Sequence, residues 1–472
     1  MHSIHPRSRP EASPSVSPAR IRISLAAKLA LLLSLAGAIP SRHAWAQASP
    51  LRAAGRAADL DSLIARALTV SPAVRAANAR GEAARDRVNP AGVRPDPMLM
   101  AGVQNFPVSA PGFTDFMTMK MIGVSQTIPY PGKLSLRRQA AGHEVAALDA
   151  ARTVVQRQVI RDVRHAYYDL AFLDRALDIA DRSRKVVSGL IAVTEARYVS
   201  GRATQADVLN AQLTSARLAQ TLASLGEERR ATLARLNALL DRGSEEPVDA
   251  PTIPDPLARA AVSASPFEVG FVSSALGARA ASSPLPSLPE LQRLAVLESP
   301  ALKQHEAMIA AQRSRVALAQ RDYLPDVDVS LAYGQRNGRS DMITATVSLP
   351  LPLHRGQKQN ELAKAAGAEL AVLEAEHDAS VRELGAEVAR LVSDAERNRT
   401  QLALYVKVFL PQGRAALASV TESYGTGKIE LSHVLEGQAA LFSSETDYFR
   451  ALSDFAKKVA ELERVVGKEI LP

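Results

Sequence analysis

The sequence of 472 residues contains no cysteine, and aromatic residues make up only 4% of it. The absence of cysteine excludes disulfides, thiolate metal sites and attachment of a lipid to an N-terminal cysteine. The scarcity of aromatic residues argues against a compact core built around rings, and the abundance of alanine and leucine favours extended helix packing. A chain of this length forms either two or three ordinary domains or one long repetitive architecture.

Long apolar runs are absent after residue 46, where no window approaches ~18 consecutive apolar residues. The sequence therefore predicts no transmembrane helix, and any part that spans a membrane must consist of strands. Before that point, a basic flank, an apolar run over 29–39 and the small-residue sequence Ala44-Trp45-Ala46 form the pattern of a secretory signal. We expect residues 1–46 to be a signal peptide rather than a buried helix.

A concentrated basic face is missing as well. The net charge of the whole chain is +8, but without residues 1–46 there remain 51 Lys and Arg against 48 Asp and Glu. Proteins that bind nucleic acid carry clustered positive charge, often interleaved with stacking aromatics. The sequence therefore predicts no nucleic-acid partner.

Motifs of enzymes and cofactor sites are incomplete. The His-Glu pairs at 143–144 and 305–306 begin like the H-E-x-x-H of zinc proteases, but no histidine follows at the fifth position. Gly425, Gly427 and Lys428 lack the earlier glycine and the following Ser or Thr of a phosphate-binding loop. We predict no enzymatic activity, no cofactor and no resident metal.

The sequence does contain a long internal repeat. The stretch "YVSGRATQADVLNAQ" at 198–212 returns as "YGTGKIELSHVLEGQ" at 424–438, and Ser-Pro-Ala at 71–73 returns at 299–301. Landmarks that keep their order at a nearly constant offset indicate a tandem duplication. We predict two structural repeats, residues 47–246 and 288–472, joined by a Pro-, Ser- and Ala-rich segment at 247–287.

Each repeat is predicted to contain a helix, two strands, a very long helix, a turn and a second long helix. In the first repeat these are a helix over 60–88, strands at 98–104 and 117–128, and helices over 133–199 and 204–240. In the second they are a helix from 288, strands at 326–333 and 342–349, and helices from 357 and 429, with a kink or break at Pro411. Leucines at coiled-coil spacing give these helices a seam for lateral packing: Leu209, Leu213, Leu233, Leu236 and Leu240.

The strands of the second repeat, "DVDVSLAY" and "MITATVSL", alternate between polar and apolar residues. This alternation is typical of a half-buried soluble sheet and also of a barrel wall with lipid outside and water inside. Four strands cannot close a useful barrel, and an open sheet edge is not tolerated in lipid. A membrane role therefore requires several chains to pool their strands.

The duplicated plan, the junction "VSQTIPYPGKLSLRRQ" at 124–139 and the paired "Y-x-x-G…VL-x-x-Q" turns together resemble the TolC-type outer-membrane efflux proteins, over nearly the whole mature chain. The resemblance implies a mainly α fold with a small β part. Long α-helical hairpins would form a trimeric α-barrel, and four strands per chain would enter a shared transmembrane β-barrel. It places the protein in the cell outer membrane with a large periplasmic part. Segment 247–287 would wrap the waist of the tunnel, or serve as a flexible linker.

The same resemblance implies a passive, gated channel of a tripartite efflux system. Its partners would be two further copies of the chain, a periplasmic adaptor protein, an inner-membrane pump of the proton-driven RND type, and outer-membrane lipid. The alternative is a soluble periplasmic coiled-coil adaptor or scaffold, but adaptors usually carry a single helical hairpin, and the duplication argues against one. The cargo stays open between antibiotic, metal ion and secreted protein.

The resemblance also assigns roles to the two turns, which would lie at the periplasmic end of the tunnel. Gly201 and Gly427 permit the chain reversal, and with Arg202 and Lys428 they would form the corners on which an adaptor docks. The aperture residues would be Asp207, Asn210, His433 and Glu436. A histidine where the family has an acid would make the aperture sensitive to pH near neutrality. The alternative is that these four are solvated residues at helix starts, where acids favour the helix N-terminus.

Five of the eight methionines lie between residues 98 and 121, and those at 117, 119 and 121 are predicted to share a strand face. Thioethers bind soft Cu(I) or Ag(I), and the "IPYPGK" junction resembles the family branch that exports heavy-metal ions. The sequence favours the ordinary alternative, in which flexible apolar side chains face lipid or a neighbouring strand.

Overall fold

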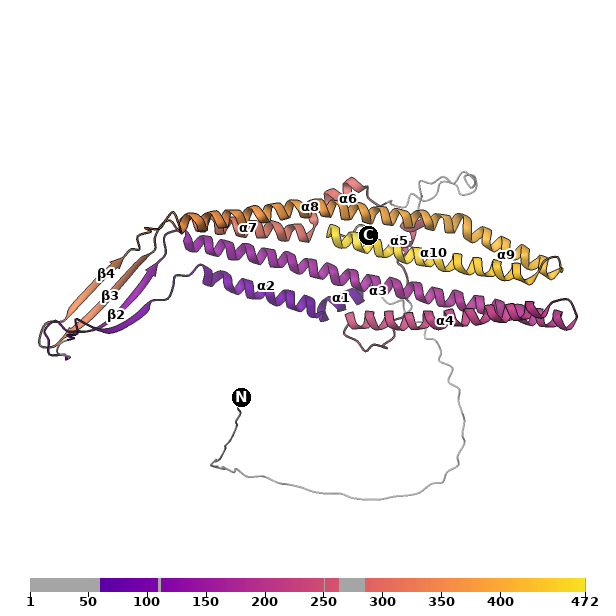
Figure 1. The fold of residues 1–472 in the computed structure, drawn as a ribbon, viewed down its shortest axis with the longest axis horizontal. Helices are drawn as coiled ribbons and strands as arrows, with labels where there is room; N and C mark the ends of the chain where they lie inside the picture. The colour runs from indigo at the N-terminus through magenta and orange to yellow at the C-terminus, as the bar shows by residue number, and fades with distance from the viewer. Residues whose placement is uncertain (1–59, 109–111, 250, 263–284, 472) are drawn as a thin grey trace, which may run out of the picture. The chain divides into compact units, whose positions relative to one another are not determined.

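The computed structural model describes residues 60–108, 112–249, 251–262 and 285–471, all within one compact unit, Ala54–Pro472. These residues are mainly helical and contain one four-stranded sheet, with helices and strands in the same order in each half of the sequence (Figure 1). The predicted signal peptide lies outside the described residues, as does the middle of the joining segment. No helix of the described residues has the length and apolar character needed to cross a membrane.

The elements follow the predicted plan closely. The first repeat consists of α1 (Leu60–Val70), α2 (Pro72–Ala91), β1 (Met98–Gln104), β2 (Met119–Ile128), α3 (Lys133–Val199) and α4 (Gln205–Leu239). A short helix, α5 (Asp255–Val262), lies in the joining segment. The second repeat consists of α6 (Leu288–Glu298), α7 (Pro300–Arg321), β3 (Val327–Arg336), β4 (Met342–Ser348), α8 (Gln359–Leu404), a π-helical turn (Tyr405–Phe409), α9 (Leu410–Gly425) and α10 (Leu431–Val466).

The single helix predicted over 60–88 is wrong, because the chain breaks between α1 and α2. Pro72 has no N–H, and its ring excludes the helical conformation for the residue before it. Ser71 accordingly has φ −57° and ψ 120°, and its hydroxyl accepts a hydrogen bond from the Val74 N–H (3.5 Å). Ser299 before Pro300 has nearly the same angles, φ −56° and ψ 120°, so the break is duplicated.

The start of β2 also differs from the prediction. Met117 lies before the strand, because the Asp115 carboxylate accepts a hydrogen bond from its backbone N–H (2.7 Å) and holds the chain in a turn. Met117 therefore does not share a strand face with Met119 and Met121.

The long helices of the two repeats have the same length. Helix α3 has 67 residues, and α8, the π-helical turn and α9, with 46, 5 and 16 residues, follow one another without interruption and equal it. A helix of this length spans on the order of 100 Å. The helix is not broken at Pro411, contrary to one of the two forms predicted there. The missing proline N–H is accommodated by the π-helical turn that precedes it.

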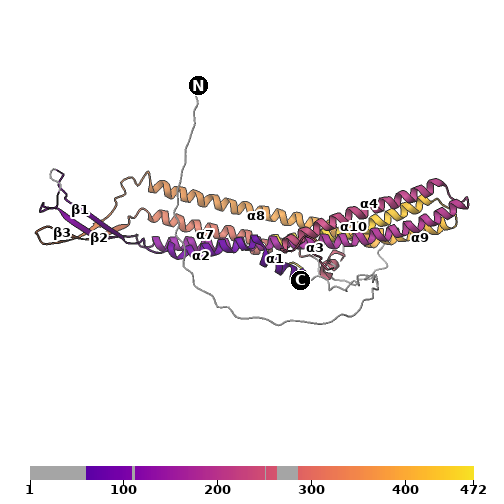
Figure 2. The same cartoon turned by 90° about the horizontal axis from the view of Figure 1, so that it is seen from below.

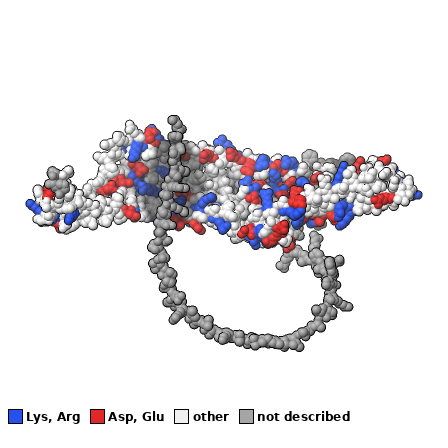
Figure 3. Space-filling model, turned by 60° about the horizontal axis from the view of Figure 1, so that its bottom comes forward, with Lys and Arg blue, Asp and Glu red and all other residues white. Residues whose placement is uncertain are grey.

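The sheet has the order β1-β2-β3-β4, and all neighbouring strands are antiparallel. The register separates two faces. The apolar face carries Leu99, Ile122, Val124, Leu331, Tyr333, Ile343 and Val347, and the polar face carries Ser125, Ser330, Thr344, Thr346 and Ser348. On the side seen in Figure 3, the strands show almost no charge except at their loop end, whereas the helices carry many charges of both signs.

The helical core is a chain of separate clusters rather than one centre. Leu233, Leu236 and Leu240 of the predicted seam are buried against α1 and α3. Leu209 and Leu213 are not, since they are 56% and 50% exposed. The joining segment contributes α5, which packs on α8 and α10 where Arg399, 6% exposed, donates to the carbonyl of Ala260 (3.1 Å).

Helices α3 and α10 are also joined by polar contacts near the middle of α3. Arg161 pairs with Glu461 (3.0 Å) and Lys457 with Asp169 (2.7 Å), while a ring nitrogen of His165 lies 3.2 Å from the carbonyl oxygen of Lys457. Burial lowers the pKa of His165 below its ordinary value, although Glu461 opposes this effect. The imidazole is therefore neutral in the folded protein.

This histidine predicts a loss of stability in mild acid. In the unfolded chain His165 takes up a proton below about pH 6.5, and in the folded protein only at lower pH, so the free energy of unfolding falls as the pH drops below that value. We expect the thermal midpoint to decline between pH 7.5 and pH 5.5, and to decline less in His165→Gln. Equal declines in both proteins would contradict the assignment.

Candidate functional site at the two helix turns

The first turn, residues 200–204, reverses the chain between α3 and α4. Gly201 has φ 69°, its N–H donates to the carbonyl of Tyr198 (2.9 Å), and the N–H of Arg202 donates to the carbonyl of Arg197 (2.7 Å). These two bonds around a left-handed glycine form a Schellman motif, which satisfies the last carbonyls of a helix.

The second turn, residues 426–430, is built in the same way between α9 and α10. Gly427 has φ 75°, its N–H donates to the carbonyl of Tyr424 (3.0 Å), and the N–H of Lys428 donates to the carbonyl of Ser423 (3.0 Å). Both turns lie at the end of the long helices away from the strands (Figures 1 and 2). The turn glycines predicted from the sequence thus have the backbone conformation that requires glycine.

Alanine at either turn glycine is expected to destabilise the turn. No atom lies within 4 Å of the added Cβ, so the cost is conformational, about 1–2 kcal/mol for a left-handed residue. Hydrogen exchange of the turn amides should accelerate about tenfold in Gly201→Ala and in Gly427→Ala. The matched control is Gly226→Ala inside α4, where the Cβ also has open space and alanine should slow exchange. Unchanged exchange at the turns would contradict the prediction.

The two turns differ at the helix that follows. Thr204 caps α4 in a reciprocal arrangement: its Oγ accepts from the Asp207 N–H (3.2 Å), and the Asp207 carboxylate accepts from the Thr204 N–H (2.9 Å). At the equivalent start of α10, Glu430 makes no side-chain capping bond, and His433 occupies the position of Asp207. The His433 Nδ1 lies 3.7 Å from a Glu436 carboxylate oxygen, and both side chains are exposed.

The four predicted aperture residues are therefore not joined within one chain. Asp207 caps its own helix, and His433 faces Glu436 on the same helix. Asn210 is exposed, and its backbone carbonyl accepts a bond from the Thr214 hydroxyl (2.9 Å). Among the described residues, no hydrogen bond or ion pair connects the first-turn pair to the second-turn pair.

Three other residues connect the two hairpins. The Arg197 guanidinium on α3 donates to the Gly425 carbonyl (2.7 Å) and lies 4.3 Å from the centre of the Tyr424 ring. The Tyr424 hydroxyl lies 3.1 Å from the Thr194 hydroxyl, and this pair is buried, with Thr194 0% and Tyr424 6% exposed. Sequence reasoning did not select Thr194 or Arg197. The tyrosine of the repeated motif was the signal that could have led to this contact.

The repeated motif has two different environments. Tyr424 and Gln438 of the second copy are buried against α3, where Gln438 donates to the hydroxyl of Ser183 (3.2 Å). Their counterparts in the first copy, Tyr198 and Gln212, are exposed, Tyr198 by 48%. Two copies of one sequence thus face a neighbour in one case and solvent in the other.

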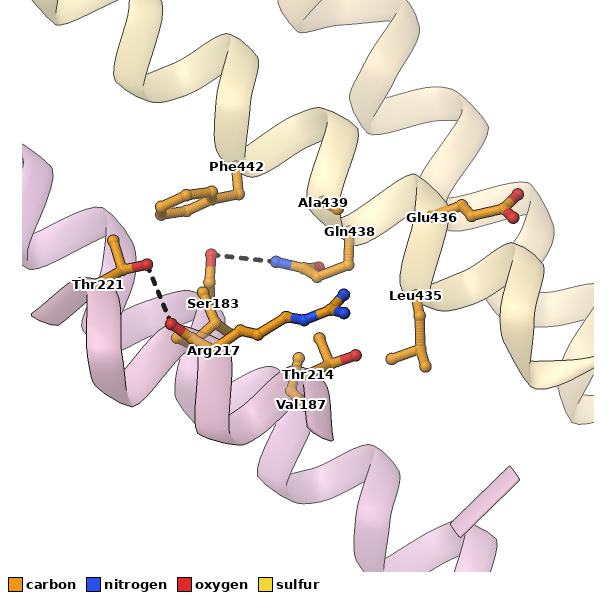
Figure 4. Close-up of a pocket in the computed structure, with 11 residues that line it drawn as sticks. Ser183, Val187, Thr214, Arg217, Thr221, Leu435, Glu436, Gln438, Ala439 and Phe442 are labelled. Atoms are coloured by element: carbon orange, nitrogen blue, oxygen red, sulfur yellow. Dashed lines mark hydrogen bonds between the residues drawn. The ribbon is translucent and has the colours of Figure 1, made fainter. Parts of the chain in front are cut away.

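A cavity of about 350 Å³ lies beside this contact, between α3, α4 and α10. Figure 4 shows Arg217 extending between Thr214 and the Ser183–Gln438 hydrogen bond, while Glu436 lies at the edge and points away. Apolar side chains form much of the remaining wall: Val187, Leu218, Leu435, Ala439 and Phe442. Glu436 therefore lies at the margin of the cavity between the two hairpins.

The described residues form duplicated helical hairpins that end in paired turns, with a four-stranded sheet at the opposite end. The sequence profile of the outer membrane efflux protein family matches residues 63–242 and 291–468. The chain belongs to this family. The predicted family, the mainly helical fold with a small sheet and the place in the outer membrane are thereby confirmed, and the adaptor alternative is not favoured.

Individual relatives are more distant. Protein CyaE of Bordetella pertussis (strain Tohama I) is 27% identical over 278 residues, which cover 57% of this chain and 53% of that protein. The chain thus matches about half the length of this curated relative. The outer-membrane channel OprN shares 19% identity at a TM-score of 0.70, covering 88% of this chain and 91% of its own. The outer membrane protein VceC from Vibrio cholerae shares 19% at 0.69, covering 87% and 96%. These two likenesses establish the fold.

Proposed function

We propose that three copies of the chain assemble into a passive exit channel across the outer membrane. The observation that carries this proposal is the unequal environment of the repeated motif. Tyr424 and Gln438 pack on α3 of their own chain, whereas Tyr198 and Gln212 have no such cover. In a closed ring of alternating hairpins, a neighbouring copy would cover the first hairpin as α3 covers the second.

Exposed apolar side chains on the first hairpin support the same assembly. They lie near the turn and are 49% to 86% exposed: Val186, Val193, Val199, Leu209 and Leu213. Large apolar side chains grouped on one surface mark an interface. The leucines that the sequence assigned to a helical seam would then find their partners in the adjacent chain.

The sheet supports the assembly at the other end. Strands β1 and β4 lie at its edges, and each pairs with only one described strand. Unpaired backbone groups are not tolerated in hydrocarbon, so the edges would pair between copies and close one barrel of pooled strands. The apolar face would contact outer-membrane lipid, and the polar face would line the channel.

The partners follow from the position of the turns. The corners formed by Gly201 and Arg202, and by Gly427 and Lys428, are exposed and cationic, and we propose that a periplasmic adaptor protein docks on them. An inner-membrane pump of the RND type would supply the energy. The chain itself would provide a gated path without bond-making chemistry.

The absence of cysteine allows a direct test of the assembly. Val420 holds in the second repeat the position that Thr194 holds in the first, so a ring would bring Tyr198 beside Val420 of the next copy. We expect Tyr198→Cys/Val420→Cys, treated with a short bismaleimide in outer membranes, to give covalent dimers and trimers. The matched control, Thr194→Cys/Tyr424→Cys, should react within one chain and stay monomeric on a denaturing gel. Monomers in both cases, or a soluble periplasmic protein, would overturn the proposal.

The aperture residues remain part of the proposal and have their own test. We expect Asp207→Ala with Glu436→Ala to raise the single-channel conductance in planar bilayers, because two acids per chain would leave the constriction. Asp207→Asn is the control, since an amide oxygen can still accept the Thr204 N–H and preserve the cap. An unchanged conductance in the double variant would remove these residues from the aperture.

A further inference from the structure

Five methionines lie on one face of the sheet. The register pairs Met98 with Ser125 and Met100 with Gly123, and it places Met121 between Gly102 and Gly334. Residues paired across antiparallel strands point to the same side. The methionines on that side are Met98, Met100, Met119, Met121 and Met342.

This side is the polar face. Ser330 and Thr346 continue the row of Met98 and Ser125, whereas Leu99, Ile122 and Leu331 point the other way. Methionines that only filled space against hydrocarbon would lie with the leucines and isoleucines. Of the two ordinary alternatives for the four described strand methionines between residues 98 and 121, packing against a neighbouring strand fits Met119, which is 9% exposed and lies against Gly334 of β3, whereas a lipid-facing position would not match the polar face.

Three of the five surround a glycine. Gly334 of β3 is paired with Met121 on one side and with Met342 on the other. The Met119 sulfur lies 3.3 Å from the position that a Cβ on Gly334 would occupy. Because neighbouring strands are only ~4.8 Å apart, the thioethers of Met121 and Met342 can reach the same space above the glycine. The missing side chain leaves space above Gly334, and the Met119 sulfur already lies beside it.

The nearest described cation is held away from this space. Arg336 is paired with Met119 across the sheet, but its Nε and Nη2 donate to the carbonyl of Ser340 (2.9 and 2.7 Å). The nearby Asp341 carboxylate accepts from the Arg336 N–H (3.2 Å) and from the Tyr333 hydroxyl, so it is already engaged. Three neutral thioethers suit a soft, singly charged ion rather than Zn²⁺ or Mg²⁺, which need nitrogen, thiolate or hard oxygen ligands.

We propose that Met119, Met121 and Met342 form a thioether site for a soft monovalent metal ion, Cu(I) or Ag(I). The site rests on the proposed function for its place on the channel-lining face, where such an ion would be cargo in transit. Met342 is 42% exposed and Met119 9%, so a weakly bound ion could leave again on the side of Met342, as conduction requires.

Titration of the purified full-length protein with silver nitrate in chloride-free buffer tests the site. We expect wild type to bind Ag⁺ at one site per chain. Met119→Leu/Met121→Leu/Met342→Leu, which keeps volume and apolar character, should bind at least tenfold more weakly. The matched control is Met308→Leu on α7, which should bind as wild type does. Equal affinity in wild type and the triple variant would overturn the proposal.

Two measurements on wild type keep the test independent of any folding defect in the variant. The chain has no cysteine, so sulfur in the first shell of bound Ag⁺ by X-ray absorption can come only from methionine. A thioether does not titrate, so the affinity should change less than twofold between pH 5.5 and pH 7.5, unlike that of imidazole or carboxylate ligands. A first shell of nitrogen and oxygen, or a steep pH dependence, would refute the site.

Conductance separates the two proposals. Pores in planar bilayers together with silver binding that does not depend on these methionines would refute the metal site and retain the channel. Silver binding that depends on them, in a protein that never forms pores, would refute the channel and retain the site.

Discussion

Replacing Arg197 by alanine is expected to separate the ends of the two hairpins within each chain. The change removes a charged hydrogen bond to the Gly425 carbonyl and a cation–π contact with Tyr424. Together these contacts are worth about 2–3 kcal/mol, which corresponds to roughly a 30- to 160-fold shift between joined and separated states. Single-channel conductance should rise several-fold, and amides near residues 190–202 and 417–430 should exchange faster.

Two variants check whether this effect belongs to the contact. Arg202→Ala removes a cation from the same turn that makes none of these contacts, and it should leave the conductance unchanged. Thr194→Val deprives the buried Tyr424 hydroxyl of its partner and should act in the same direction as Arg197→Ala, at a cost of about 1–3 kcal/mol. If Arg202→Ala opens the channel as much as Arg197→Ala, the effect comes from charge and not from the contact between hairpins.

Replacing Lys133 by alanine is expected to weaken the connection between the strands and the long helices. Lys133 is the first residue of α3, its side chain is 4% exposed, and its ammonium lies 3.1 Å from Asp322 and 2.9 Å from Asp326. Asp326 also accepts the Tyr130 N–H (2.9 Å), so this cluster joins the end of β2 to the start of β3. Loss of the cation should cost about 2–3 kcal/mol, less than for a fully buried pair because both aspartates retain contact with water.

If three copies assemble as proposed, the readout for Lys133→Ala is the amount of trimer in outer membranes, which should fall strongly. Lys133→Arg keeps the charge and should retain most of the trimer. The control is Lys303→Ala, since Lys303 pairs with Glu298 in an exposed position where an ion pair contributes little. Equal trimer levels in Lys133→Ala and Lys303→Ala would refute the structural role of the junction.

Much of the fold could be predicted because it depends on local patterns. The proline-free stretch gave α3 its correct bounds, 133–199, and the alternation of side chains in "MITATVSL" gave β4 within one residue. The break at Ser71 was missed because apolar periodicity continues through it, although Pro72 carried the signal. A kink or break was expected at Pro411, whereas the chain forms a π-helical turn before it and stays helical.

The candidate site was less predictable, because contacts between hairpins depend on which face each helix turns to its neighbour. The motif located both turns, and their glycines follow directly from backbone geometry. The motif could not show that the Asp207 side chain caps helix α4, nor that Tyr424 is buried while Tyr198 is exposed. The pairing of strands showed which face of the sheet carries the methionines. Residue spacing along one strand could not show that Met342 lies on the same face as Met119 and Met121.

The π-helical turn at Tyr405–Phe409 has a consequence for whatever binds the periplasmic end. A π-helical turn takes more residues than an α-helical one, so residues beyond it are rotated about the helix axis relative to an unbroken helix of equal length. Helix α3 has no such turn. The side chains of α9 are therefore rotated about the helix axis relative to those of α8, a change that has no counterpart in α3. If three copies form the proposed ring, first and second turns would alternate around its end and would present different surfaces. Six identical docking molecules could then bind there only in two distinct orientations.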